Sequence, residues 1–318
     1  KLGHPRALWM LFGAEFWERF CYYGMRALLA VYVAAQFFAH LPAGEAKAQA
    51  SLTYGGYTSL VYATGILGGM IADRYLGYQR SIILGGLLMA VGCFMLLSPE
   101  IHLFLIGLAV IVAGNGLFKP NISTMVGKLY APGDVRRDSG FTIFYMGINA
   151  GAFVAPLITA VWIGANYGYK YGFLAAAIGM IFGIAVFQVR KGVLGHVGKS
   201  PAGREGWGPV FNVLVGAILL VPVIYFLLSQ SEILGVVLLA LFAGLAVYLI
   251  WSGYSETSVQ GQKYIAMFLL FTANILFWAL FEQAGASLNF LAQDHVNAPF
   301  HFTLFQSANP LFIVLLAP

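Results

Sequence analysis

Long apolar runs separated by short polar connections make up most of the chain. An α-helix needs about 20 mostly apolar residues to cross the hydrocarbon core of a bilayer. Ten segments fit this pattern, at 11–38, 52–72, 81–98, 102–123, 140–163, 171–189, 209–229, 233–252, 264–286 and 302–318. The pattern therefore predicts an all-α polytopic membrane protein.

The longest polar connection runs from Arg190 to Gly208 and is rich in Gly, Pro and charged residues. It is the natural boundary between a first block of six helices and the rest of the chain. The last predicted span ends at Pro318 with no hydrophilic tail after it. We therefore expect the sequence to be a piece of a longer protein.

Composition and charge favour a membrane protein over a soluble or nucleic-acid-binding one. Charged residues make up only 9% of the chain, against about 25% in a typical soluble domain. The net charge of +5 comes from basic residues scattered between apolar runs, so we expect no nucleic-acid partner. With the N-terminus placed in the cytoplasm, 12 of the 17 Lys and Arg residues fall on the inner side and only Lys47 and Lys170 on the outer side, as the positive-inside rule requires.

Residues typical of metal sites or enzyme centres are sparse in the predicted spans. Cys21 and Cys93 lie inside apolar segments without metal-ligand spacing or a redox partner nearby, so we interpret both as packing residues. There is no H-E-x-x-H motif, no Ser/His/Asp arrangement and no clustered metal ligands within the spans. A membrane enzyme, and a receptor with a substantial soluble domain, are therefore weaker hypotheses than a carrier, and we expect no metal or cofactor.

Six ionisable residues nevertheless lie within predicted spans. They are Glu15, Glu18, Arg19, Arg26, Lys119 and Glu282. Each would cost about 2.5–3.5 kcal/mol or more if it faced lipid at a helix centre. Three are acidic and three basic, so we expect them to face a shared interior or an aqueous cavity and to pair with one another.

Helical spacing gathers these groups on defined faces. At about 100° per residue, the first helix carries one polar stripe within an arc of about 100°, formed by Glu15, Glu18, Arg19, Tyr22 and Arg26. Other helices add polar groups at helical spacing or singly: Tyr54, Tyr57 and Tyr62; Asn115 and Lys119; Asn149; and Asn274, Trp278 and Glu282. This arrangement indicates a solute pathway. The structural alternative is that a buried ion pair is architectural, or that a lone Asn only bridges helices.

Proton handling within the spans would depend on carboxylates. A buried carboxylate whose basic partner moves away tends to take up a proton, which couples protonation to helix motion. No histidine lies at mid-span. A proton relay would therefore use Glu15, Glu18 and Glu282.

The segment GGMIADRYLGYQR, from Gly68 to Arg80, resembles the G-x-x-x-D-R-x-x-G-x-x-R signature of the major facilitator superfamily. The pattern positions are Gly69, Asp73, Arg74, Gly77 and Arg80. We expect the glycines to give a tight turn and close helix packing, and Asp73 to pair with a basic group that latches the inner face. The plainer alternative is an ordinary charged inner loop. In GNGLFKPNISTMVGKLY, Pro120 is expected to kink the fourth helix beside Lys119.

Together these residues resemble one family, the proton-dependent oligopeptide transporters (POT) of the major facilitator superfamily. The family's first-helix motif E-x-x-E-R-F-x-Y-Y matches Glu15, Glu18, Arg19, Phe20, Tyr22 and Tyr23. Further matches lie at Gly114–Ser123, Phe141–Phe153 and Phe277–Gly285, and in the final stretch FQSANPLFIVLLAP. The resemblance runs from about His4 to Pro318 and suits the bacterial branch.

The resemblance implies the major facilitator superfamily fold, with twelve core helices and two extra helices between its halves. The chain would then divide into an N-terminal six-helix bundle at 1–190, a cytoplasmic linker at 191–208, two additional transmembrane helices at 209–252 and the start of a C-terminal bundle at 253–318. The last part would hold core helices seven and eight, so the C-terminal bundle would be incomplete in this chain.

The resemblance also implies roles for individual residues. The peptide carboxylate would be held by Arg26 and Lys119, and the peptide amino group by Glu282 and Asn149. The pocket would be lined by Tyr22, Tyr23, Tyr62, Trp278 and Asn309. Proton movement would be coupled through Glu15, Glu18, Arg19, Lys119 and Glu282, and the gates would use Arg26, Glu282 and Asp73.

The function implied is a proton-coupled symporter that imports di- and tripeptides by alternating access. It would work as a monomer in the bacterial inner membrane, with small peptides, protons and the lipid bilayer as its partners. The alternative within the same fold is another solute, such as nitrate, an amino acid or a peptide-like organic anion. The E-x-x-E-R pattern favours proton coupling but does not identify the solute.

Overall fold

Helices follow one another along the whole described part of the chain. The structure is a computed structural model that describes residues 3–317, and no strand occurs within that range. The elements are α1 (Arg6–Phe37), α2 (Ala43–Ile71), η1 (Ala72–Leu76), α3 (Tyr78–Met95), α4 (Ile101–Lys128), α5 (Arg137–Pro156), η2 (Leu157–Gly164), α6 (Ala165–Tyr167), α7 (Tyr169–Arg190), η3 (Lys191–Leu194), α8 (Gly208–Ser229), α9 (Ser231–Ser255), α10 (Ser258–Phe281), η4 (Glu282–Gly285), α11 (Ser287–His295), η5 (Phe302–Leu304) and α12 (Phe305–Leu316).

The prediction of an all-α membrane protein is confirmed. Seven helical segments of the described chain are long and apolar enough to cross a membrane: Tyr78–Met95, Ile101–Lys128, Arg137–Tyr167, Tyr169–Leu194, Gly208–Ser229, Ser231–Ser255 and Ser258–Gly285. The other three predicted spans coincide with α1, α2 and α12. Since α1 and α2 carry polar side chains and α12 is short, their crossing of the membrane stays a prediction.

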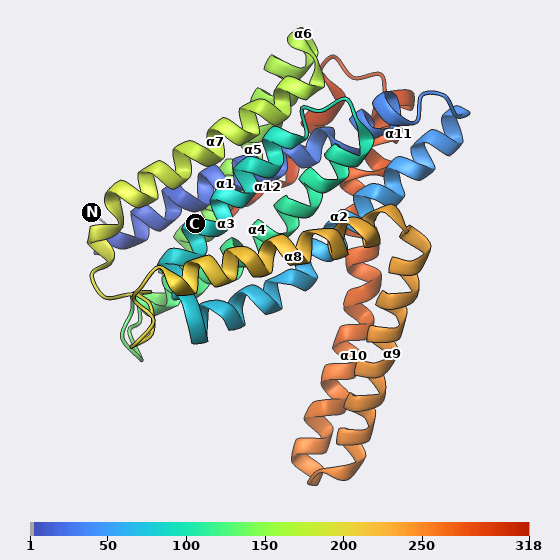
Figure 1. Ribbon diagram of the computed structural model, residues 1–318. Helices are drawn as coiled ribbons and strands as arrows, with labels where there is room; N and C mark the ends of the chain where they lie inside the picture. The colour runs from blue at the N-terminus through green and yellow to red at the C-terminus, as the bar shows by residue number, and fades with distance from the viewer. Residues whose placement is uncertain (1–2, 318) are drawn as a thin grey trace.

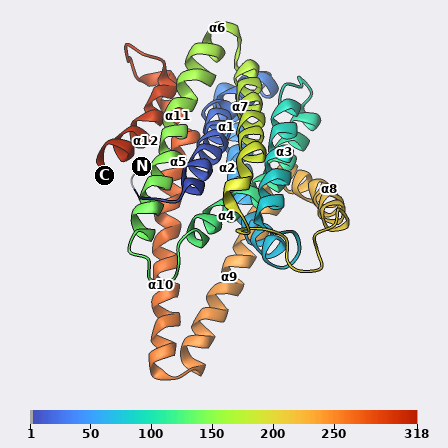
Figure 2. The same cartoon turned by 90° about the vertical axis from the view of Figure 1, so that its left-hand side faces the viewer.

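The helices α1 to α7 pack side by side, with α1 between α5, α7 and α2, and α3 against α4 and α7. Helix α8 lies along α4 and α2, and α12 packs on α5. In contrast, α9 and α10 pair with each other as a hairpin that extends away from the other helices in both views (Figures 1 and 2). This grouping agrees with a boundary after α7, although the division into four parts stays a prediction.

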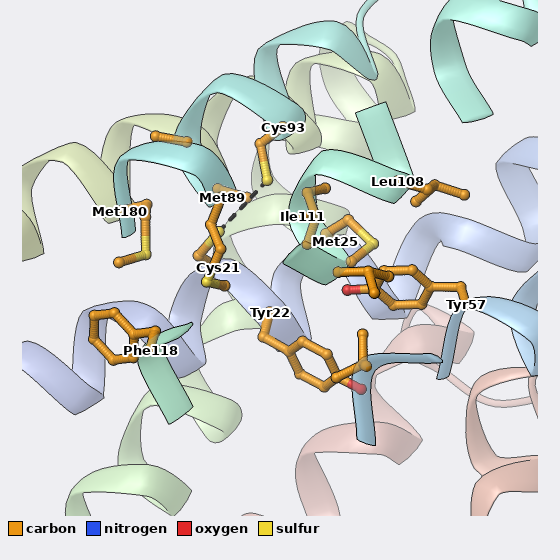
Figure 3. Packing of buried hydrophobic residues seen from close by; sticks show 14 of the residues in the cluster. Cys21, Tyr22, Met25, Tyr57, Met89, Cys93, Leu108, Ile111, Phe118 and Met180 are labelled. Carbon is orange, nitrogen blue, oxygen red and sulfur yellow. Dashed lines mark hydrogen bonds between the residues drawn. The ribbon is translucent and has the colours of Figure 1, made fainter. Parts of the chain in front are cut away.

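Sulfur-containing side chains fill part of the core between α1 and α3. Figure 3 shows Cys21 and Cys93 facing each other beside Met89, with their Sγ atoms 3.5 Å apart. Both cysteines are buried and both are free thiols. They do pack in the core, but the expectation that neither has a thiol nearby is wrong, because the crossing of α1 and α3 joins positions that are far apart in sequence.

The superfamily signature forms the turn between α2 and α3. Gly77 has φ = 81°, a conformation that suits glycine, and a Cβ there would lie 2.7 Å from the carbonyl carbon of Lys199. The expected tight turn is therefore present. The close helix packing is made one residue before the pattern position: a Cβ on Gly68 would lie 1.8 Å from the Gly116 carbonyl oxygen, whereas Gly69 faces open space.

The same turn holds the polar segment between α7 and α8. Arg80 donates hydrogen bonds to three carbonyls of this segment, at Arg204, Glu205 and Gly206. The backbone N–H of Gln79 donates to the Gly198 carbonyl over 2.9 Å. The predicted linker is thus fastened to the α2–α3 turn by contacts to its backbone.

The expected basic partner of Asp73 is not found. Asp73 accepts a hydrogen bond from the Tyr78 hydroxyl, and it makes no ion pair with any residue in the range 3–317. The side chain of Lys128 lies over the Tyr78 ring, 4.7 Å from its centroid. Lys128 therefore approaches the tyrosine rather than the carboxylate.

Helix α4 begins with a side-chain cap and runs on through its proline. The Glu100 carboxylate accepts from the backbone N–H groups of His102 and Leu103, at 2.9 and 2.7 Å. These two bonds stabilise the ionised carboxylate and lower the pKa of Glu100. Helix α4 is unbroken from Ile101 to Lys128 with Pro120 inside it, so the proline does not end the helix, and the expected kink stays a prediction.

Candidate functional site

A buried charged cluster joins α1 to α4. Arg19 Nη2 donates to Glu18 Oε1 over 2.7 Å, and Arg19 Nε also pairs with Glu18 Oε2. Glu15 Oε1 lies 3.2 Å from Arg19 Nε. From α4, Asn115 Nδ2 donates to Glu18 Oε1 over 3.0 Å. All four side chains are buried, and both oxygens of Glu18 have partners, whereas Glu15 Oε2 has none among the described residues.

A second cluster joins α1 and α2 to the end of α10. Arg26 Nη2 and Glu282 Oε2 form an ion pair at 2.9 Å. The Tyr54 hydroxyl accepts from Arg26 Nε over 2.5 Å and donates to Glu282 Oε2 over 3.0 Å. The Tyr62 hydroxyl is 3.5 Å from Glu282 Oε1. The structure thus brings Arg26 and Glu282 together although 256 positions separate them in the chain.

Aromatic rings lie between the two clusters. The guanidinium of Arg19 is 5.9 Å from the Tyr23 ring centroid, and that of Arg26 is 5.5 Å from the same ring. The Lys119 ammonium lies 4.4 Å from the centroid of the Tyr62 ring, a distance at which a cation is attracted to the ring face. With Lys119 added to Glu15, Glu18 and Arg19, the cluster contains two acidic and two basic groups, so their formal charges balance.

A cavity of about 730 Å³ opens between α2, α9 and α10. Its walls include Tyr54, Tyr62, Asn274, Trp278, Glu282 and Gln283. The rings of Tyr62 and Trp278 lie 5.9 Å apart at one side of it. Small-molecule sites usually have volumes of about 300–1,000 Å³, so this cavity has room for a solute, with a carboxylate and several neutral polar groups on its wall.

Several sequence-predicted site residues lie away from this cavity. Tyr22 is buried and packs edge-on against Tyr23. Asn149 is buried on α5, and its Nδ2 donates to the Tyr145 carbonyl of its own helix. Asn309 is exposed on α12, which packs on α5. The structure therefore does not gather all of the predicted pocket residues around one cavity.

The importance of Tyr54 is only partly visible in the sequence. Tyr54, Thr58 and Tyr62 follow at i, i+4 and i+8, so they share one face of α2, and all three line the cavity. Tyr57 does not line the cavity, and its hydroxyl is buried without a hydrogen-bond partner in the described chain. Helical spacing alone does not distinguish Tyr54 from Tyr57, since residues three apart are neighbours on a helix surface. The position of Tyr54 between Arg26 and Glu282 depends on tertiary structure.

A further contact, between α2 and α11, could not be predicted from the sequence. Lys47 at the start of α2 forms an ion pair with Asp294 on α11, and its ammonium lies 5.7 Å from the centroid of the Phe290 ring. Nearby, Asn289 Nδ2 donates to the Ala27 carbonyl of α1 over 3.1 Å. Helix α11, which the apolar pattern did not predict, is therefore docked on α1 and α2 beside the Arg26–Glu282 pair.

Comparison with known proteins identifies the family. The sequence model of PTR2, the POT family, matches residues 79–318. The chain belongs to the POT family. The resemblance to the POT family is thereby confirmed.

Relatives of this POT chain include proteins named as di- and tripeptide transporters. A di-/tripeptide transporter of Lactococcus lactis subsp. lactis (strain IL1403) is 38% identical, over 99% of this chain and 68% of its own length. Dipeptide and tripeptide permease A of Proteus mirabilis (strain HI4320) is 34% identical, over 99% of this chain and 64% of its own length. The POT chain thus spans about two thirds of the length of these relatives.

Solved structures show the same fold. A crystal structure of a variant of the peptide transporter POT in complex with alafosfalin is 38% identical, with a TM-score of 0.80 over 99% of this chain and 67% of that one. A POT family transporter in complex with 5-aminolevulinic acid is 33% identical, with a TM-score of 0.81 over 99% of this chain and 69% of that one. The POT chain therefore has the helical arrangement of these transporters, a major facilitator superfamily fold.

Proposed function

We propose that the protein is a proton-coupled symporter that imports di- and tripeptides by alternating access. The observation that carries the proposal is the Arg26–Glu282 ion pair, which joins α1 to η4, directly after α10, at the edge of a cavity of suitable size. On the same helix α1, the Glu15–Glu18–Arg19 cluster supplies buried carboxylates for proton coupling. Membership of a transporter family, and relatives named as di- and tripeptide transporters, support the same function.

A zwitterionic peptide carries a carboxylate and an amino group, so it can offer a new partner to both Arg26 and Glu282. Its carboxylate would take the place of Glu282 on Arg26, with Lys119 as a second cation, and its amino group would meet Glu282 and Asn149. Each buried charge then keeps an opposite partner, which avoids the cost of an unpaired charge. Tyr22, Tyr23, Tyr62, Trp278 and Asn309 would form the walls of the pocket once the helices move.

Proton coupling in this proposal uses the cluster on α1. Arg19 holds both oxygens of Glu18 but only one oxygen of Glu15, so Glu15 Oε2 is open to a proton. Glu282 would take a proton when Arg26 has moved away from it and no peptide amino group has yet replaced Arg26 as its partner. Arg26 and Glu282 would close the outer gate, and Asp73, through its bond to Tyr78, would contribute to the inner one.

The membrane setting follows from the same proposal. The protein would be a multi-pass protein of the bacterial inner membrane with its N-terminus in the cytoplasm, working as a monomer and carrying out transport without catalysis. A second candidate is a small amino acid or peptide-like organic anion, because a related POT transporter binds 5-aminolevulinic acid. That compound also carries an amino group and a carboxylate.

Gradient-driven uptake tests the proposal. The full-length protein in liposomes should accumulate a labelled dipeptide when the outside is made acidic, and an ionophore should abolish accumulation. In Glu18→Gln the ratio of driven uptake to gradient-free exchange should fall at least tenfold, because the buried carboxylate no longer titrates. Glu45→Gln, which neutralises an exposed carboxylate on α2, is the control and should behave as wild type.

Two results would count against the proposal in different ways. No exchange or accumulation of any di- or tripeptide by the wild-type protein would refute the function. Peptide accumulation that is equally strong in Glu18→Gln would refute the coupling role of that residue. Competition by amino acids and organic anions but not by peptides would favour the second candidate.

A further inference from the structure

Asn115 occupies a fixed position opposite the carboxylates of α1. Its side chain is 1% exposed. The glycines on either side of it pack tightly: a Cβ at Gly114 would lie 2.5 Å from the Gly85 carbonyl oxygen, and one at Gly116 would lie 2.8 Å from the Thr64 carbonyl oxygen. The backbone that carries Asn115 is therefore held by both α3 and α2, so the amide has a defined direction.

The amide contacts Glu18 with one of its two polar ends. Nδ2 donates to Glu18 Oε1 over 3.0 Å, while Oδ1 is buried and has no hydrogen-bond partner in the range 3–317. A buried acceptor without a partner is uncommon in folded proteins. A carboxylate can only accept a hydrogen bond, whereas a protonated carboxyl group also donates one. A half-turn of the amide would present Oδ1 to such a donor.

We propose that Asn115 is a positioning residue that hydrogen-bonds Glu18 in both of its protonation states, through Nδ2 to the carboxylate and through Oδ1 to the acid. An aliphatic side chain could do neither, and a basic one could only donate. The amide thus holds the Glu18 side chain in position while Glu18 binds and releases a proton. This inference rests on the proposed coupling role of Glu18.

Other groups also act on Glu18 and are unchanged in the test below. On α1 these are Glu15, Arg19 and Cys21. From neighbouring helices they are Tyr57 of α2 and Lys119 of α4. Helices α5 and α7 meet this stretch of α1 through Gly151, against the Phe16 carbonyl, and Gly179, against the Phe20 ring.

The test is the pH dependence of gradient-driven dipeptide uptake by the full-length protein in liposomes. In Asn115→Leu, ionised Glu18 loses a charge-assisted hydrogen bond, which is stronger than the neutral bond that the protonated acid loses, so the midpoint of the pH profile should move up by about one pH unit. Asn115→Asp is the second variant, in case the leucine variant folds poorly. It keeps the size of the side chain and adds a negative charge, so it should move the midpoint in the same direction.

Asn121→Leu is the matched control. Asn121 is also buried on α4 with an unpartnered Oδ1, but its Nδ2 donates to the carbonyls of Gly68 and Leu117. Its loss should lower thermal stability and leave the pH midpoint in place. A midpoint within about 0.2 pH units of wild type in both Asn115 variants, or an equal shift in Asn121→Leu, would overturn the inference. Absence of any gradient-driven uptake in the wild-type protein would instead overturn the proposed function.

Discussion

At the scale of single residues, the site is organised by hydrogen bonds between neutral side chains and buried charges. The Tyr54 hydroxyl bonds to both partners of the Arg26–Glu282 pair, and the Asn115 amide bonds to Glu18. Hydrogen bonds to charged groups contribute about 1.5–3 kcal/mol each, more than bonds between neutral groups. Removal of such a neutral partner should therefore lower the stability of the protein even though every charged side chain remains.

Tyr54→Phe should lower the stability of the protein by about 1–3 kcal/mol, because Arg26 and Glu282 both lose a buried partner. The matched control is Tyr57→Phe. Tyr57 is also buried on α2, but its hydroxyl has no partner among the described residues, so its removal should be neutral or slightly stabilising. Thermal unfolding in one detergent measures both variants, and equal losses in the two would contradict the role given to the Tyr54 hydroxyl.

At the scale of elements, the crossing of α2 and α4 depends on glycine contacts at one point. Gly68 lies against the backbone of Gly116, and Asn121 Nδ2 donates to the Gly68 carbonyl over 3.2 Å. Small residues allow membrane helices to approach closely and to gain packing contacts. This close approach fixes the height of Lys119 and Asn115 on α4 relative to the tyrosines of α2.

Gly68→Ala should destabilise the protein by about 1–3 kcal/mol or more, because the new methyl group would meet backbone atoms that cannot move aside. Gly69→Ala is the control, since a Cβ there meets nothing within 4 Å. Alanine is the better helix former, so this variant should be unchanged or more stable by about 0.5–1 kcal/mol. Thermal unfolding again distinguishes them, and the reverse order would refute the packing argument.

At the scale of the whole molecule, two ion pairs hold the end of α10 and α11 against α1 and α2. Arg26–Glu282 is largely buried, whereas the side chains of Lys47 and Asp294 are 36% and 31% exposed. An exposed pair contributes only about 0.2–1 kcal/mol. In the proposed transport cycle, the exposed Lys47–Asp294 pair would therefore adjust the balance between closed and open forms rather than determine it.

Lys47→Glu should shift that balance towards the open form by up to about fivefold, the factor that corresponds to about 1 kcal/mol. The rate at which an impermeant thiol reagent labels a cysteine introduced at Ser51, which lines the cavity, would report the opening, with Cys21 and Cys93 replaced by alanine. The charge-swapped double variant, Lys47→Glu with Asp294→Lys, should restore the original rate. A double variant that labels as fast as Lys47→Glu would show that the pair does not hold the gate.

The sequence predicts the faces of helices better than it predicts which faces meet. The i, i+3 and i+4 spacing of Glu15, Glu18 and Arg19 was enough to place them together, because helical geometry is local. The contact of Cys21 with Cys93 and that of Lys47 with Asp294 span 72 and 247 positions. Such pairs depend on helix crossings, which the pattern of a single helix does not encode.

The apolar pattern does not predict the short helix α11, for a related reason. Its segment, Ser287–His295, is too short and too polar to match an apolar span. It is held instead by tertiary contacts, through Asn289 on the Ala27 carbonyl and through the buried ring of Phe290. The motif pattern predicts close packing at Gly69, whereas Gly68 makes it, because the motif spacing does not say which of two adjacent glycines faces α4.

The hydrogen bonds from Arg80 to the segment between α7 and α8 have a consequence for evolution. Its three acceptors are main-chain carbonyls, at Arg204, Glu205 and Gly206. Every amino acid brings the same carbonyl group, so substitutions at these three positions leave the acceptors in place. For this contact, selection should therefore act on Arg80 and not on the side chains at the three positions that supply the carbonyls.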